Sequence, residues 1–318
     1  MKKITLKGIW EVVKNTFGCF INDKVTKLSG SLAYFTVFSM GPLLVVMISF
    51  CGLFLGREAV EGQVYSVLRN FIGQDTALQL QHIIENAAIG GKSKLAAIIG
   101  VITLVIGATS IFAEIQDSIN IIWGIKPKPK KGLVKMLLNR LLSFSVIISL
   151  GFLLLVSLVV SGVIEALNKR LQAAYPDVTI VVFYVTNLVL TLIISMVIFG
   201  VIFKVLPDAR IKWKDVMSGA FVTSLFFLLG KFLISFYISR SHVGSTYGTA
   251  GSLVVLLLWV YYSSVILYFG AEFTKAYAIK YGSEILPNSY AVTMKQVEVE
   301  TGKASVQEKE KIIPENKA

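Results

Sequence analysis

Long apolar runs without a charged residue divide the chain into six segments. A helix needs roughly 20 apolar residues to cross the hydrocarbon core of a membrane, and five of the runs are long enough on their own. The fifth run is interrupted by Lys231, but apolar residues continue to Ile238. The runs are Leu28–Gly56, Leu95–Ala113, Leu141–Ile164, Val178–Phe203, Val216–Gly230 and Ser241–Ala271. The pattern predicts an all-α polytopic membrane protein with six transmembrane helices, numbered here as spans one to six.

Two shorter patterns predict helices outside the spans. Between Ile9 and Val25, apolar residues recur at helical spacing, and Lys7, Lys14 and Lys24 lie on the other face. This amphipathic N-terminal helix either lies on the cytoplasmic leaflet, where lysines meet anionic headgroups, or packs against the protein's own cytoplasmic loops. Between spans one and two, the apolar spacing in 59–73 and 75–88 predicts two short periplasmic helices.

Charge fixes the expected orientation. Only 16% of the 318 residues are charged, and 23 of the 31 Lys and Arg fall in the two terminal segments and in the connections after spans two and four. Because Lys and Arg accumulate in cytoplasmic loops, both termini are expected in the cytoplasm of a bacterium, with the chain in the inner membrane. The first span is expected to act as an uncleaved anchor. The net charge of +12 suggests membrane lipids as partners; a basic, aromatic-rich module for nucleic acid is absent from the sequence.

These boundaries give three regions. Residues 1–27 form the cytoplasmic amphipathic segment, residues 28–282 the six-helix transmembrane domain, and residues 283–318 a polar tail that is expected to be disordered in the cytoplasm.

Charged residues at membrane depth are costly and therefore become candidate functional groups. Lys231 lies within span five. It could line a cavity for an anionic substrate, or it could be a snorkelling anchor or one half of a structural ion pair. Glu114 and Asp117 share one helical face at the inner end of span two, and Glu272 lies at the inner end of span six. The three acids could surround a cytoplasmic vestibule, or they could pair with the lysine-rich loops, which is the favoured interpretation for Asp117.

Small residues and one proline predict where helices meet or bend. Pro42 breaks the hydrogen-bond ladder of span one. Gly244 and Gly248 have GxxxG spacing, and Gly251 continues this small-residue face. Gly270 and Ala271 directly precede Glu272. This triplet predicts a close helix contact that holds a fixed acid.

An enzyme is not indicated by the sequence. The two histidines, His82 and His242, have no metal-ligand spacing, and no nucleotide loop, GxSxG elbow or intramembrane aspartate pair is present. We therefore expect no cofactor, no metal site and no catalytic residue. The sequence leaves open whether the protein forms a homo-oligomer.

Four stretches together resemble the YihY / virulence factor BrkB family of bacterial inner-membrane proteins. They are "LSGSLAYFTVFSMGPLL" in span one, "IWGIKPKP" after span two, "VLPDARIKWKDVMSGAFV" at the start of span five and "YGTAGSLVVLLLWVYYSSVILYFGAEFTKA" in span six. The resemblance runs from about residue 10 to residue 280. It implies a transporter, or an exporter of a lipid or metabolite, of unknown substrate. A non-transporting membrane scaffold or envelope-assembly factor is the alternative. Members have also carried the name ribonuclease BN, but this sequence offers no metal-hydrolase ligands, so ribonuclease activity is not expected.

Overall fold

The structure, a computed structural model, describes residues 5–39, 94–128, 176–240 and 251–294. The predicted periplasmic helices, span three, Pro42, Gly244 and Gly248 lie outside the described residues, as does the predicted tail from residue 295 onward.

The described residues are mostly helical. The helices are α1 (Leu6–Asn22), α5 (Lys94–Ile122), α7 (Pro176–Val205), α8 (Trp213–Arg240) and α10 (Gly251–Tyr281), and residues 25–39 form a further helical segment. Three stretches are long and apolar enough to cross a membrane: Leu188–Val205, Trp213–Leu233 and Leu256–Tyr281. These three, found within the described residues, overlap the predicted spans four, five and six, although the last one begins and ends later than predicted. However, α10 continues to Tyr281, so Glu272 lies inside a helix and does not mark its end.

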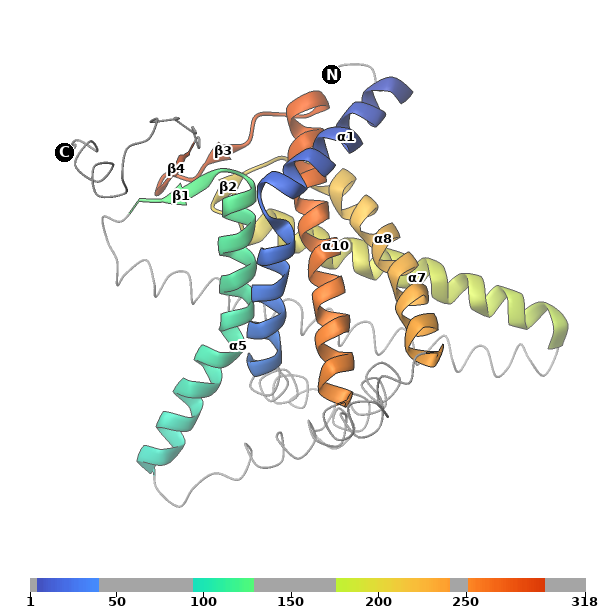
Figure 1. Cartoon of the computed structure of the whole chain (residues 1–318), viewed down its shortest axis with the longest axis horizontal. Helices are drawn as coiled ribbons and strands as arrows, with labels where there is room; N and C mark the ends of the chain where they lie inside the picture. The colour runs from blue at the N-terminus through green and yellow to red at the C-terminus, as the bar shows by residue number, and fades with distance from the viewer. Residues whose placement is uncertain (1–4, 40–93, 129–175, 241–250, 295–318) are drawn as a thin grey trace, which may run out of the picture.

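Helix α10 is the centre of the described fold. It packs against α8, α1 and α5, and α7 covers α8. Figure 1 shows α10 standing between α8 on one side and the helical segment 25–39 with α5 on the other, while α1 crosses its upper end obliquely. Because one helix touches elements from both halves of the chain, its surface decides how they fit together.

A reciprocal contact between glycine and threonine joins α8 to α10. A Cβ atom added to Gly219 would lie 1.7 Å from the Thr274 hydroxyl oxygen, and one added to Gly270 would lie 1.9 Å from the Thr223 hydroxyl oxygen. The helices are antiparallel, so each threonine lies over the glycine of its partner helix. We call these four residues the Gly–Thr seam. Small residues let the two backbones approach closely where no hydrophobic effect drives helices together.

The threonines of the seam need no partner across the interface. The Thr223 hydroxyl donates to the Gly219 carbonyl oxygen at 2.7 Å, and the Thr274 hydroxyl donates to the Gly270 carbonyl oxygen at 2.7 Å. Each buried hydroxyl is thus satisfied within its own helix, as hydroxyls in membrane helices commonly are. The predicted contact at Gly270 therefore has a defined neighbour, Thr223, and a symmetrical counterpart at Gly219.

Two pairs of short strands lie beyond the helix ends, although the sequence predicts only helices. Strand β1 (Ile125–Pro127) pairs antiparallel with β4 (Ala291–Thr293), and β2 (Ala209–Arg210) pairs antiparallel with β3 (Leu286–Pro287). The prediction of a disordered tail is therefore wrong for residues 286–293. The physical reason is long-range pairing: strands of two or three residues show no periodicity, and their partners lie far away in the sequence.

Asp208 holds these strands to α5. Its buried carboxylate accepts hydrogen bonds from the side-chain amides of Gln116, at 3.1 Å, and Asn120, at 3.0 Å. The Asp208 backbone amide donates to the Asn120 side chain at 2.9 Å, and the Asp208 carbonyl accepts from the Asn288 backbone amide at 2.9 Å. One residue thus connects the end of α5, the loop after α7 and the segment after α10.

We predict that Gly270→Ala destabilises the protein by about 1–3 kcal/mol, the usual cost of inserting a methyl group into a packed contact. Helix propensity alone would favour alanine by about 1 kcal/mol. Thermal unfolding in detergent, followed by size-exclusion chromatography, measures the difference. Gly30→Ala is the matched control, because a Cβ at Gly30 meets nothing within 4 Å. Adding Thr223→Ala to Gly270→Ala removes the nearest clashing atom and should restore part of the loss. Equal stability of the Gly270 and Gly30 variants would contradict the seam.

Candidate functional site

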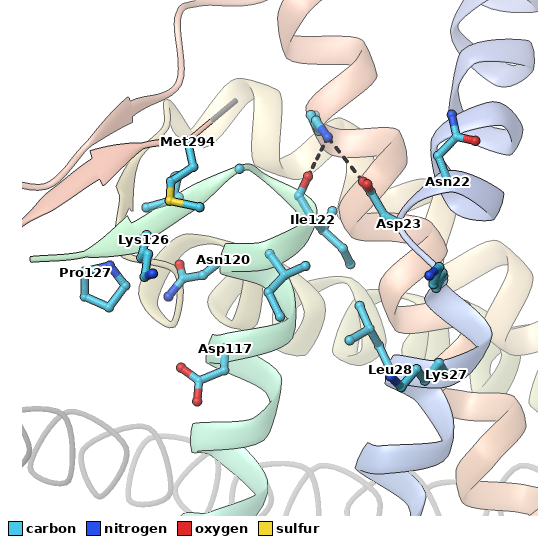
Figure 2. Close-up of a pocket in the computed structure, with 15 residues that line it drawn as sticks. Asn22, Asp23, Lys27, Leu28, Asp117, Asn120, Ile122, Lys126, Pro127 and Met294 are labelled. Carbon is cyan, nitrogen blue, oxygen red and sulfur yellow. Dashed lines mark hydrogen bonds and ion pairs between the residues drawn. The ribbon is translucent and has the colours of Figure 1, made fainter. Parts of the chain in front are cut away.

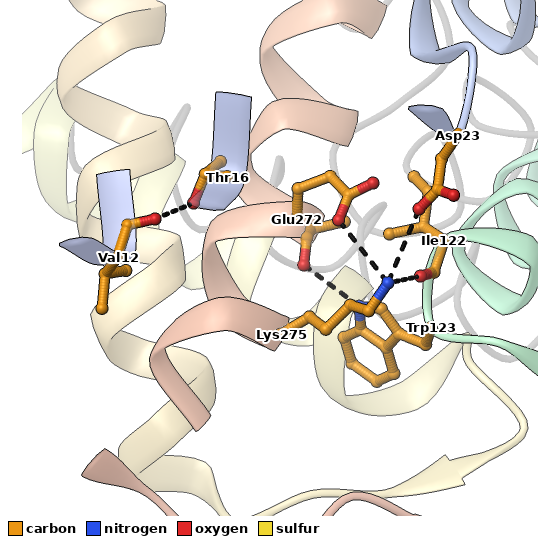
Figure 3. Close-up of polar contacts among 8 residues, drawn as sticks. Val12, Thr16, Asp23, Ile122, Trp123, Glu272 and Lys275 are labelled. Atoms are coloured by element: carbon orange, nitrogen blue, oxygen red, sulfur yellow. Dashed lines mark hydrogen bonds and ion pairs between the residues drawn. The ribbon is translucent and has the colours of Figure 1, made fainter. Parts of the chain in front are cut away.

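The ammonium group of Lys275 lies where three elements meet. Its Nζ atom is 3.5 Å from Asp23 Oδ2 and 3.8 Å from Glu272 Oε2, and it donates a hydrogen bond to the Ile122 carbonyl oxygen. Figure 3 shows the lysine reaching from α10 toward the end of α5 and the junction after α1. We call Asp23, Glu272 and Lys275 the charge cluster.

Local backbone geometry positions each member of the cluster. Helix α1 ends at Asn22, and the chain turns through Asp23 and Lys24, whose φ of 52° is in the left-handed region. This turn starts the next helix and directs the Asp23 side chain toward α10. The Ile122 carbonyl belongs to the last turn of α5, where backbone carbonyls have no partner within the helix. The Trp123 indole N–H donates to the Ala271 carbonyl oxygen at 3.1 Å and fixes this end of α5 to α10.

Glu272 is the most confined charge of the cluster. It is 1% exposed, and no hydrogen-bond partner reaches either carboxylate oxygen in the described part of the chain. Glu272 lies between Gly270 and Thr274, so the seam on one side of α10 leaves its side chain on the other side, facing Lys275 and Asp23. A buried carboxylate without hydrogen bonds is costly, and the lysine 3.8 Å away offsets only part of that cost.

A pocket of about 860 Å³ opens beside the cluster, between α5, the start of segment 25–39 and the strand β1. Figure 2 shows part of its lining, with Asp117 and Asn120 on α5, Asp23 in the turn after α1 and Lys27 at the start of segment 25–39. Its charged lining residues are Lys24, Lys27, Lys126, Lys275, Asp23 and Asp117. Four lysines against two acids make the pocket net positive, while Leu28, Ile121 and Ile125 give it apolar walls. Such a lining suits an anionic ligand with an apolar part.

A second pocket, of about 600 Å³, lies on the other side of the cluster between α1 and α10. Its lining includes Glu11, Lys14, Cys19, Glu272 and Lys280. Lys275 lines both pockets, so the charge cluster separates two solvent-accessible spaces.

The predicted site residues are only partly brought together. Asp117 lines the first pocket and Glu272 the second. Glu114 is half-buried on α5, Lys231 is half-buried on α8, and neither lines these two pockets. Gly251 is the first residue of α10. The three acids that were predicted to surround one vestibule therefore do not share either of these two pockets.

Sequence reasoning missed Asp23 and Lys275 as members of the site. Lys275 follows Glu272 by three residues, a spacing that places both on one helical face and could have signalled a pair. Asp23 carried no local signal, because its role depends on a turn between two helices. Among the described residues, no group of three or more His, Cys, Asp or Glu is arranged to hold a metal ion.

These features define a polytopic helical membrane protein with a charged junction at one end of its helices. The chain belongs to the virulence factor BrkB family, whose family model matches residues 16–292. It is 27% identical over 269 residues to a UPF0761 membrane protein of Pseudoalteromonas atlantica, covering 84% of this chain and 85% of that protein. A UPF0761 membrane protein of Photobacterium profundum is 25% identical over 304 residues, covering 93% of this chain and 89% of the relative. No solved structure matches the chain significantly.

We predict that Lys275→Met destabilises the protein by about 3 kcal/mol, since removing one partner from a largely buried ion pair leaves the other charge uncompensated. Lys280→Met is the matched control. Lys280 pairs with the exposed Glu11, and such surface pairs contribute about 0–1 kcal/mol. Thermal unfolding in detergent measures both. The double variant Lys275→Met/Glu272→Gln should recover part of the stability; no recovery would show that Lys275 does not stabilise the fold by compensating Glu272.

We predict that Cys19 reacts slowly with thiol reagents near neutral pH. Burial raises the pKa of the Cys19 thiol, the negative charge of Glu272 raises it further, and Lys275 opposes the rise. Glu272→Gln should therefore lower the pKa of Cys19 and speed alkylation at a fixed pH. The measurement is the pH profile of alkylation in a Cys51→Ser background, which leaves Cys19 as the one thiol. An unchanged profile would mean that Glu272 carries no charge near this thiol.

Proposed function

We propose that this protein is an inner-membrane transporter that exports an anionic lipid or metabolite. The proposal includes six spans, cytoplasmic termini and the absence of enzymatic activity, ribonuclease included. The three long apolar helices and the membership of a membrane-protein family support the membrane part of this proposal. The positive-inside distribution of Lys and Arg supports a position for the charge cluster and both pockets at the cytoplasmic end of the spans.

One observation carries the transport proposal. Glu272 is buried and accepts no hydrogen bond from the described part of the chain, next to a net-positive pocket with apolar walls. A charge held in this way is expensive unless it is paired or used, and intramembrane acids commonly mark ion or substrate pathways. Among the described residues, Glu272 contacts the cation of Lys275, which also lines the pocket. A substrate anion that approaches Lys275 would weaken the attraction between Lys275 and Glu272. Substrate binding would therefore be coupled to the charge state of Glu272.

The same contacts also support a second candidate function, which is purely structural. Lys275 connects α10 to Asp23 and to the end of α5, so the cluster could serve only as a structural clamp. A membrane scaffold or envelope-assembly factor would need nothing more. The two functions differ in what happens when the charge is removed but the shape is kept.

We predict that Glu272→Gln abolishes transport without reducing the amount of protein in the membrane. The measurement compares cellular metabolites and lipids between deletion cells and cells complemented with wild-type or variant protein. Glu114→Gln is the matched control, because it removes an acid from α5 that lines neither of the two pockets. Lys231→Met tests the cation in the outer part of α8, and it should impair anionic substrates most if Lys231 lines the pathway.

Three other results of this experiment would each support a different conclusion about Glu272 or the protein. Loss of protein abundance in Glu272→Gln would identify a structural ion pair. Full activity in Glu272→Gln would show that the acid has no working role. No accumulated compound in deletion cells, with altered envelope assembly instead, would favour the scaffold.

A further inference from the structure

Helix α1 has two different apolar faces, and in the described part of the chain one is buried against α10 while the other is largely exposed. Its buried face consists of Gly8, Val12 and Thr16, and it packs on α10. A Cβ at Gly8 would lie 1.7 Å from the Tyr281 hydroxyl oxygen. The two helices are therefore in direct contact here, and no lipid or other group fits between them. Phe273 and Tyr281 of α10 cluster with Val12. The face toward α10 is therefore closed by protein.

The second face is apolar and open. Leu6, Trp10, Val13, Phe17 and Ile21 recur at intervals of three or four residues and so form one stripe along α1, which we call the apolar strip. Leu6 is 89% exposed, Trp10 69%, Phe17 54% and Ile21 72%, while Val13 between them is half-buried against the cluster with Val12. Large apolar side chains in a contiguous exposed row mark a surface that binds something apolar.

The strip continues into the surface of the membrane-spanning helices. The Phe17 ring lies 5.1 Å from the Phe269 ring of α10, and the Phe269 ring lies 5.4 Å from the Phe226 ring of α8. Phe226 is 45% exposed and belongs to the stretch of α8 that is apolar enough to span the membrane. The apolar environment that surrounds α8 therefore extends to α1 without a polar break along this row of rings.

Charge at the edge of the strip favours an anionic surface. Lys7 and Lys14 are exposed next to the strip on the helical wheel. Glu11 is the one acid between Leu6 and Asn22, and Lys280 lowers its pKa through a hydrogen bond and an ion pair. Its negative charge is thus matched by a cation from α10, which leaves the lysines of α1 to face anionic headgroups.

We propose that α1 is an interfacial helix whose apolar strip is inserted in the headgroup region of the same membrane that α7, α8 and α10 span. Interfacial helices of this kind bury their apolar face about 5–10 Å into the boundary between headgroups and acyl chains. The occupant of the strip is lipid, and the face formed by Gly8, Val12 and Thr16 holds the helix to the protein. The inference does not depend on transport, because it concerns only how α1 meets the membrane.

The test compares two faces of α1 in one membrane. Single cysteines at Trp10→Cys and Ile21→Cys report on the strip, and Asn15→Cys and Gly18→Cys report on the polar face. All four positions are exposed, so labelling should leave the fold intact. The background is the full chain with Cys19→Ser and Cys51→Ser, which removes both native thiols. Each variant carries an environment-sensitive fluorophore in nanodiscs of phosphatidylethanolamine with a minority of phosphatidylglycerol.

Quenching by lipids with a spin label near the headgroup should be several times larger at positions 10 and 21 than at positions 15 and 18, and quenching by aqueous iodide should show the reverse order. Equal access of iodide to all four positions would overturn the proposal. Protection of positions 10 and 21 from both quenchers would overturn it as well, because the strip would then be covered by protein, either this chain's own loops or a partner.

Discussion

The close approach of α8 and α10 determines where the charged groups at this end of the protein can lie. At the Gly–Thr seam each helix offers a glycine to the threonine of the other, and the two contacts are four residues apart on both helices. Two contacts at this spacing fix register and separation together, since sliding either helix would put a threonine against a larger side chain. Ala220 and Ala271, which follow the two seam glycines, are fully buried. Glu272 comes next in α10, so the rotation that the seam imposes decides which way this carboxylate faces.

The charge cluster depends on that rotation. With the seam on one side of α10, Glu272 and Lys275 face the elements on the other side, where the turn after α1 supplies Asp23 and the end of α5 supplies a free carbonyl. One ammonium group thus satisfies groups from three parts of the chain that are distant in sequence. This arrangement leaves fewer charges unpaired, and unpaired charges near the hydrocarbon region of a membrane are costly. It also couples the parts: a movement of α1 or α5 changes the surroundings of Glu272, and the two pockets meet at the same lysine.

Local patterns predicted part of this structure. The apolar runs located α7, α8 and α10, because the length and hydropathy of a span are properties of a continuous segment. The triplet Gly270, Ala271 and Glu272 indicated a close contact with a fixed acid, since small residues beside a charge are informative on their own.

Other features could not be predicted from local patterns. The reciprocal partner Gly219 could not be recognised, because its role requires the register between two helices. Asp23 could not be recognised either, because its position depends on the turn at Lys24. Lys24 has a positive φ that non-glycine residues rarely adopt, so the sequence does not indicate this turn. The strands after α10 were missed because residues 286–293 gain order only from partners on distant loops. For α1, the sequence showed an amphipathic helix but could not separate the face that α10 buries from the face that remains exposed.

If the Gly–Thr seam positions the charge cluster, the two must be linked by a coupling free energy that can be measured. A double-mutant cycle with Asp23→Asn and Lys275→Met, evaluated by unfolding in detergent, measures the interaction between the two side chains. In the wild-type background we expect a coupling of roughly 1–3 kcal/mol, as for residues in contact within one ion-pair network. In a Gly270→Ala background, where α8 and α10 are forced apart, the coupling should fall toward zero. An unchanged coupling in that background would mean that the charge cluster forms independently of the seam.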